Sequence, residues 1–154
     1  MTKMRNAPVV DATGLTKAYG KGDREIRPLD GLDLVVPDRE FLALMGPSGS
    51  GKSTLLHIIG GLALPDSGRC EVNGENLAGL SERRLCDIRA ATIGFIFQSF
   101  NLIPSLTIEE NVAVPLFYQK INRKPRRLRA AAALALVGLQ ARLMSQALRK
   151  HTAP

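Results

Sequence analysis

The sequence predicts an α/β fold. Two observations lead to this prediction. Runs of strand length alternate with helical patterns that carry recognisable caps. A glycine-rich segment, GPSGSGKST at 46–54, stands between an apolar run and a helical pattern. At 154 residues the chain has the length of a single domain.

The first half of the chain is expected to begin with two strands. VVDATGLTKAYG alternates loosely and predicts a strand that ends near Tyr19. A second strand, LDGLDLVVPD, closes at the Pro-Asp pair at 37–38. EFLALM, at 40–45, is a continuous apolar run typical of a strand buried on both faces. LLHIIGGL predicts a helix that ends at the Gly-Gly pair at 60–61.

Turn residues and a further apolar run follow. PDSG and the Asn-Gly pair at 73–74 bracket a short strand, RCEV. Ser81 is a suitable N-cap for a helix that continues through Arg89. TIGFIF, at 92–97, then predicts another buried strand, which ends at Gln98.

Caps define the helices expected in the last third of the chain. TIEE, at 107–110, has the spacing of a capping box and opens a helix toward Phe117. Pro125 stands at the start of a second helix, RRLRAAAALALVG, for which Gly138 is the stop signal.

Composition excludes several classes of protein. Hydrophobic residues make up 45% and charged residues 23%, as in ordinary globular domains. No apolar run reaches the ~20 residues that span a bilayer, and the N-terminus lacks a signal-peptide core, so we expect a cytoplasmic protein. Cys70 and Cys86 are far apart and are interpreted as reduced structural thiols. His57 and His151 have no metal-binding spacing.

Positive charge is concentrated in the second half. Residues 1–77 carry nine basic and ten acidic side chains, a net charge of −1, whereas residues 78–154 carry twelve and four, a net charge of +8. A cluster of five basic residues occurs within 123–129: Arg123, Lys124, Arg126, Arg127 and Arg129.

The glycine-rich segment matches the pattern of a phosphate-binding loop, G-x-x-x-x-G-K-[ST]. Glycines let backbone N–H groups converge on phosphate oxygens, and the following helix adds its positive end. Lys52 would reach the β- and γ-phosphates of ATP, and the Ser53 hydroxyl would bind Mg²⁺. The sequence therefore predicts a P-loop NTPase core. The loop residues expected to bind nucleotide are Gly46, Pro47, Ser48, Gly49, Ser50, Gly51, Lys52, Ser53 and Thr54.

The residues around this loop resemble the nucleotide-binding subunit of ABC transporters. An aromatic residue, the loop, the PDSG turn and a strand-ending glutamine occur in order over about residues 10–139. The stretch GFIFQSFNLIPSLTIEENVAVPL looks most like the branch that serves lipoprotein release and MacB-type efflux.

The resemblance implies roles for two residues outside the loop. Tyr19 occupies the position of the aromatic that stacks on adenine, and Gln98 that of the glutamine that contacts Mg²⁺ or the attacking water. The resemblance also implies the architecture: a P-loop NTPase core with an N-terminal antiparallel β segment, a partial α-helical subdomain and an incomplete sheet. The segment 99–116 would face a transmembrane permease subunit. Two nucleotide-binding subunits would enclose ATP in full-length relatives, and the protein would lie on the inner face of the cell membrane through its permease.

Other parts of the family pattern do not occur in this sequence. There is no LSGGQ, no aspartate follows Asp87 and no glutamate follows Glu110. The acids that follow the loop lack the apolar strand expected before a Mg²⁺-binding acid and a general base. We therefore expect this chain to bind ATP without hydrolysing it and assign no catalytic residue. The hypothesis is a truncated or frameshifted domain, with 140–154 outside the family register.

Three alternatives remain open from the residues alone. The chain could be a generic P-loop nucleotide-binding protein, which shares every local feature except Tyr19 and Gln98. The basic cluster at 123–129 could bind nucleic acid, although no aromatic interleaves it, or it could face anionic lipid. A small-metabolite kinase would need further basic residues and a lid, which we do not find. No nucleic-acid partner is expected.

Overall fold

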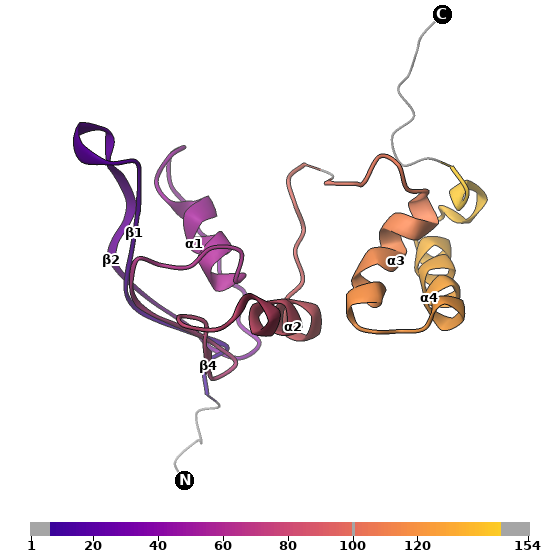
Figure 1. Ribbon diagram of the computed structural model, residues 1–154, viewed down its shortest axis with the longest axis horizontal. Coiled ribbons are helices and arrows are strands. Elements are labelled where there is room, and N and C mark those ends of the chain that lie inside the picture. The colour runs from indigo at the N-terminus through magenta and orange to yellow at the C-terminus, as the bar shows by residue number, and fades with distance from the viewer. Residues whose placement is uncertain (1–6, 100, 146–154) are drawn as a thin grey trace, which may run out of the picture. The chain divides into compact units, whose positions relative to one another are not determined.

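A computed structural model describes residues 7–99 and 101–145, which form two compact units (Figure 1). Unit 1 extends to Arg89 and unit 2 begins at Ala90. Residues 146–154, which include His151 and most of the segment expected outside the family register, are not among the described residues. No helix in the described part of the chain has the length and apolar character needed to cross a membrane.

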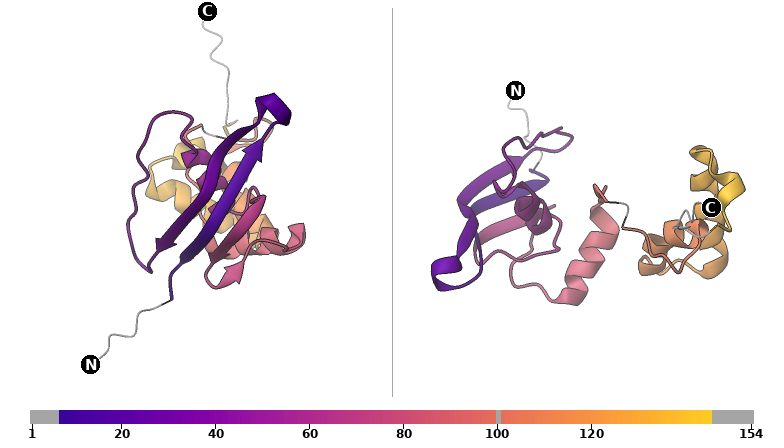
Figure 2. Two further views of the ribbon diagram at one scale, coloured as in Figure 1. Left: turned by 90° about the vertical axis from the view of Figure 1, so that its left-hand side faces the viewer. Right: turned by 90° about the horizontal axis from the view of Figure 1, so that it is seen from above.

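Unit 1 contains an antiparallel sheet in the order β2-β1-β3-β4, seen face-on in the left view of Figure 2. A single 3-10 turn, η1 (Gly22–Arg24), joins the long strands β1 and β2. The bounds of the strands are Val10–Tyr19 for β1, Ile26–Val36 for β2, Ser67–Val72 for β3 and Glu75–Asn76 for β4. The two predicted N-terminal strands are confirmed, as is the short strand RCEV.

The core of unit 1 lies between the sheet and the helix α1 (Lys52–Ile59), which packs against β2 and β3. Leu15, Ile58 and Leu77 are fully buried, so a strand, a helix and a loop each contribute an apolar side chain to the core. Burying each such side chain stabilises the fold by roughly 1.5–3 kcal/mol. Helix α2 (Glu82–Thr92) adds Leu85 to this core.

The predicted Asn-Gly turn and the helix caps of unit 1 are confirmed, whereas Ser67 and Gly68 of the predicted PDSG turn lie in β3. Asn73 and Gly74 both have positive φ, 50° and 79°, so the β3–β4 hairpin has the two left-handed residues of a type I′ turn. Gly60 caps α1, and Gly61 adopts φ 63° directly after it. At α2, the hydroxyl of Ser81 accepts a hydrogen bond from the Arg84 N–H at 3.3 Å.

Unit 2 is built around a hairpin of two helices, α3 (Ile108–Tyr118) and α4 (Arg123–Leu136), followed by a 3-10 turn, η2 (Gln140–Arg142). The predicted capping box at the start of α3 is present in both directions between Thr107 and Glu110. Gly138 has φ 72° and follows the end of α4, as predicted.

Two predicted strands, EFLALM and TIGFIF, are not strands in the structure. In the first, Phe41 and Met45 are each 91% exposed; in the second, Ile96 is fully exposed. A strand needs a neighbour to accept its backbone hydrogen bonds, and no strand in the described residues pairs with either segment. A continuous apolar run is therefore not sufficient to predict a buried strand, because the burial depends on a pairing strand elsewhere in the chain.

Candidate functional site

The glycine-rich loop leads directly into α1, and glycine backbone conformations shape it (Figure 1). Gly46, Gly49 and Gly51 have φ values of 154°, 83° and 89°, in the region that side chains disfavour. A Cβ at Gly46 would lie 2.9 Å from the Ser50 Oγ. The loop is therefore tightly curved, with residues 46–50 exposed and Gly51 buried.

The Lys52 ammonium lies inside this curve. Its Nζ donates hydrogen bonds to the carbonyl oxygens of Gly46, at 2.9 Å, and Pro47, at 2.6 Å, and to the Ser50 Oγ, at 3.1 Å. Lys52 is also the first residue of α1, so the positive end of the helix lies at the same place. A full positive charge and a helix N-terminus thus converge on one glycine-rich loop, which favours an anion.

The sheet fixes the junction between the loop and α1. A Cβ at Gly51 would lie 2.2 Å from the Pro28 carbonyl oxygen and 3.2 Å from the Leu29 Cδ2, both on β2. Only glycine permits this approach of backbone to backbone. Sequence reasoning assigned Gly51 to the phosphate loop but missed this contact, because nothing in the local pattern identifies Pro28 as its neighbour.

Tyr19 lies at the end of β1 and pairs with Ile26, which is two residues from Pro28 along β2. At about 3.3 Å per residue, Ile26 and Pro28, which contacts Gly51, are roughly 7 Å apart along β2. The Tyr19 ring is 47% exposed, and the Lys17 Nζ lies 5.7 Å from its centroid. The aromatic and the loop–helix junction therefore occupy the same end of the β1–β2 hairpin.

Asp66 holds Lys17 in place. Its Oδ1 accepts from the Lys17 Nζ at 2.7 Å, and its Oδ2 accepts from the Ala18 N–H at 2.7 Å. The hydrogen bond from Lys17 and then that from Ala18 lower the pKa of the Asp66 carboxyl below its usual range. This ion pair ties the residue before β3 to the end of β1 that carries Tyr19.

The two residues predicted to contact Mg²⁺ lie in different units. Ser53 is exposed on the first turn of α1, next to Lys52. Gln98 is an exposed residue of unit 2, and its approach to the loop stays a prediction. No group of three or more His, Cys, Asp or Glu side chains in the described residues has the arrangement of a metal site.

The cysteines are free, as predicted for Cys70 and Cys86. Cys70 is fully buried in β3, where burial, with a smaller effect from Asp11, raises the pKa of its thiol to about 11. Cys70 therefore remains a neutral thiol that packs in the core. Cys86 is exposed on α2.

Comparison with known proteins decides the family. The profile of the ABC transporter family matches residues 29–152. The chain belongs to the ABC transporter ATP-binding family. The predicted family resemblance is thereby confirmed for most of the sequence, including the loop, the PDSG turn and both helices of unit 2.

Individual relatives agree. An uncharacterized ABC transporter ATP-binding protein of Thermotoga maritima is 43% identical over 135 residues, which cover 88% of this chain and 58% of the relative. A macrolide export ATP-binding/permease protein, MacB, of Hyphomonas neptunium is 42% identical over 136 residues, 88% of this chain and 21% of the relative. The chain thus spans only part of the length of these ABC proteins.

A solved structure confirms the fold class. The dimeric ATP-binding cassette MJ0796, in a post-hydrolysis state bound to ADP and Pi, matches with a TM-score of 0.80 and 39% sequence identity. The match covers 89% of this chain and 60% of that one. The predicted α/β architecture, with its antiparallel β segment, P-loop core and helical segment, is therefore that of part of an ABC cassette.

Proposed function

We propose that this chain binds Mg-ATP through the loop 46–54, as part of the ATP-binding subunit of an ABC transporter. One observation carries the proposal: the Lys52 ammonium is held inside a glycine-rich loop at the N-terminus of α1. Phosphate oxygens would replace the Gly46 and Pro47 carbonyls as acceptors for this ammonium, because ionised acceptors form stronger hydrogen bonds than neutral carbonyls.

The remaining contacts follow the chemistry of each side chain. The Ser53 hydroxyl is an oxygen ligand of the kind Mg²⁺ prefers, and its exposure leaves it accessible to the ion and the phosphates. Tyr19 would stack on adenine, since its ring is half exposed at the end of the hairpin next to the loop–helix junction. Gln98 would supply a further contact to Mg²⁺.

The setting in a transporter is supported by the relatives. Several are named ATP-binding/permease proteins, and the cassette MJ0796 is dimeric. This chain would accordingly act with a transmembrane permease and a second nucleotide-binding subunit, on the inner face of the cell membrane. Export or lipoprotein release is the matching task, by likeness to macrolide and pyoverdine export proteins.

Titration of the purified chain with ATP, with and without Mg²⁺, tests the binding proposal. Lys52→Ala removes charge-assisted hydrogen bonds of about 1.5–3 kcal/mol and should weaken ATP binding by roughly 10- to 150-fold. The matched control is Lys124→Ala, which removes an exposed lysine of unit 2. Equal ATP affinity of the Lys52→Ala variant and the unaltered chain would contradict the role of the loop.

ATP turnover tests the expected lack of hydrolysis. Without a positioned general base, the rate should be about 10²–10⁴ times below that of a full-length cassette measured in parallel. Turnover at the rate of the full-length cassette, abolished by Lys52→Ala, would show that this chain supplies a base of its own.

A further inference from the structure

The start of α4 carries a dense group of positive charges that the nucleotide site does not use. Residues 90–145 contain seven basic and two acidic side chains. We call the basic face the five side chains of the first two turns of α4: Arg123, Lys124, Arg126, Arg127 and Arg129.

Both carboxylates of this part of the chain are already occupied. Glu109, only 7% exposed, accepts from Arg127 at 2.7 and 3.3 Å. Glu110 completes the capping box with Thr107. In the described residues, the four other members of the basic face therefore have no carboxylate within ion-pair distance.

This arrangement is unfavourable for an isolated helix. Like charges recur at i, i+3 and i+4 along the first two turns, which destabilises a helix. They also stand at the positive end of the helix dipole, where the first turn has no acidic residue and Asn122 provides no side-chain cap. An external layer of negative charge would relieve both effects.

Exposed apolar side chains adjoin these charges. A groove of about 500 Å³ at the turn between α3 and α4 is lined by the rings of Phe117 and Tyr118 and by Lys120, Arg123 and Arg126. Phe117 and Tyr118 are 60% and 64% exposed, and the Arg126 guanidinium lies 5.1 Å from the centroid of the Phe117 ring. Leu128, which is 65% exposed, lines a second groove together with Arg123, Lys124 and Arg127.

We infer that this surface of unit 2 docks on the anionic phospholipid headgroups of a membrane. Arginine and lysine would meet the phosphates, while the aromatic and aliphatic side chains would enter the boundary between headgroups and acyl chains. Charge complementarity selects an anionic partner, and the exposed aliphatic side chains favour a bilayer over a nucleic acid, whose backbone would leave them in water. The inference does not depend on nucleotide binding, because none of the residues of this surface is among those proposed to bind ATP or Mg²⁺.

Flotation of the purified chain with phospholipid vesicles tests the inference. The chain should bind vesicles that contain phosphatidylglycerol and not vesicles of phosphatidylcholine alone. Binding should fall as salt is raised, because the Debye length shrinks from about 10 Å at 0.1 M to about 3 Å at 1 M. Absence of binding, or equal binding to neutral vesicles, overturns the inference.

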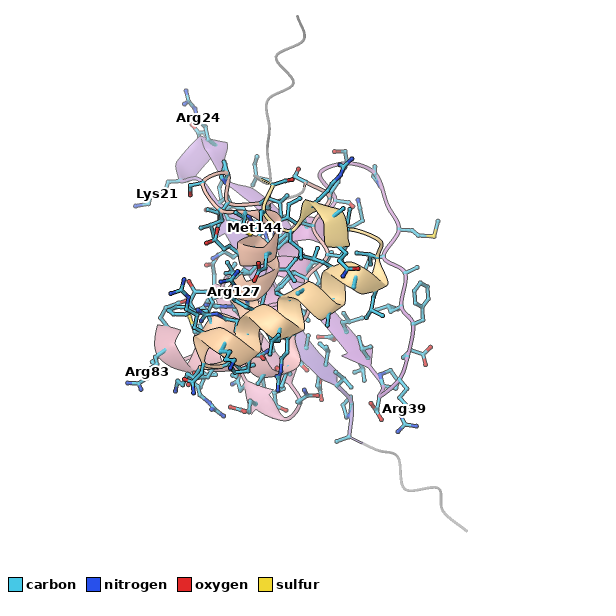
Figure 3. All side chains as sticks on the ribbon, turned by 90° about the vertical axis from the view of Figure 1, so that its right-hand side faces the viewer. Lys21, Arg24, Arg39, Arg83, Arg127 and Met144 are labelled. Carbon is cyan, nitrogen blue, oxygen red and sulfur yellow. The ribbon has the colours of Figure 1, made fainter. Side chains whose placement is uncertain are left out.

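Paired variants locate the surface. Neutralising Arg123, Lys124 and Arg126 to Gln should weaken binding by about 100-fold, since each charge contributes at an anionic surface. Arg127 is kept, because its removal would leave the buried Glu109 unpaired. The control neutralises three exposed basic residues of unit 1, Lys21, Arg24 and Arg83, labelled in Figure 3 together with Arg127. Equal losses in the two triple variants overturn the assignment to α4.

Further comparisons separate the possible occupants. A variant that exchanges Arg123→Lys, Lys124→Arg and Arg126→Lys should bind like the unaltered chain, and circular dichroism checks that each variant keeps its helices. Lys52→Ala should also bind vesicles normally, which distinguishes this surface from the nucleotide site. Displacement from vesicles by soluble glycerol phosphate, or by duplex DNA at equal phosphate concentration, would identify a different ligand and overturn membrane docking.

Discussion

The two units of this chain differ in net charge and in whether their candidate sites are formed by backbone or by side chains. Residues 1–89 carry twelve basic and twelve acidic side chains, whereas residues 90–154 carry nine basic and two acidic, a net charge of +7. The described residues of unit 1 form six ion pairs, among them Lys17–Asp66, Arg84–Glu75 and Arg89–Glu82. In unit 2 the described ion pair is Glu109–Arg127.

This difference concerns mechanism as well as composition. The candidate site of unit 1 is the glycine-rich loop, whose backbone conformation depends on glycines. At Gly51 this conformation is fixed by contact with β2. The feature of unit 2 is a set of side chains on an ordinary helix hairpin. We therefore expect unit 1 to be sensitive to single methyl groups, and unit 2 to charge.

The largest effect is expected at Gly51. Gly51→Ala combines a left-handed backbone with a Cβ 2.2 Å from the Pro28 carbonyl oxygen, and should destabilise unit 1 by roughly 2–6 kcal/mol. The control is Gly49→Ala, which has a similar φ of 83° but no atom within 4 Å of its Cβ, and should cost about 1–2 kcal/mol. Urea unfolding measures both changes.

Hydrogen exchange shows where the Gly51→Ala change acts. Amides of β1 and β2 should lose protection, while those of α3 and α4 should keep theirs. Equal loss in both units would mean that they unfold together, and the division between them would have no energetic meaning.

Core truncations test the same division more directly. Leu77 is fully buried in unit 1 and Leu134 is 3% exposed in α4 of unit 2. Replacing either by Ala should cost about 2–5 kcal/mol by loss of burial and creation of a cavity. Leu77→Ala should abolish ATP binding and leave vesicle binding intact, and Leu134→Ala should do the opposite. A loss of both activities in each variant would contradict separate units.

The sequence was sufficient where structure is decided within a few residues. The Asn73-Gly74 turn needs two left-handed residues, and the Thr107–Glu110 capping box closes within one helical turn. Both features are therefore determined by residues close together in the sequence. The glycine-rich loop is similar in part, because Lys52 bonds to Gly46, Pro47 and Ser50, all within six residues of it.

It was insufficient where a partner lies far along the chain. Phe41 and Ile96 belong to apolar runs predicted as strands, yet a strand exists only where another strand accepts its hydrogen bonds. The contact of Gly51 with Pro28 and the pair Lys17–Asp66 join residues separated by 23 and 49 positions, which no local pattern marks. The proposed contacts of Tyr19 with adenine and of Gln98 with Mg²⁺ likewise involve residues far apart in the sequence.

A smaller effect is expected for Tyr19, the aromatic side chain of the proposed nucleotide site. Tyr19→Ala should weaken ATP binding by about 1–3 kcal/mol through loss of stacking on adenine. Tyr118→Ala removes an exposed ring of unit 2 and should leave ATP affinity unchanged, while weakening attachment to anionic vesicles. If both variants bind ATP like the unaltered chain, Tyr19 is only an exposed strand residue.

The smallest expected effect is the loss of stability at low pH, to which one carboxylate in each unit contributes. Hydrogen bonds lower the pKa of Asp66 in unit 1, chiefly that from Lys17, and of Glu110 in unit 2, chiefly that from the Thr107 backbone. A lowered folded pKa means that the contribution to stability is present above the unfolded values, about 3.9 for Asp and 4.3 for Glu. It is lost as the pH falls through the lower folded pKa.

Asp66→Asn and Glu110→Gln should therefore destabilise the chain at pH 7, and the difference from the unaltered chain should shrink below about pH 4. Urea midpoints between pH 7 and 3 measure this, with hydrogen exchange to assign each loss to β1 and β3 or to α3. Asp23→Asn is the control, since Asp23 makes no hydrogen bond or ion pair within the described residues. A difference that stays constant with pH would show that these carboxylates act through shape and not through charge.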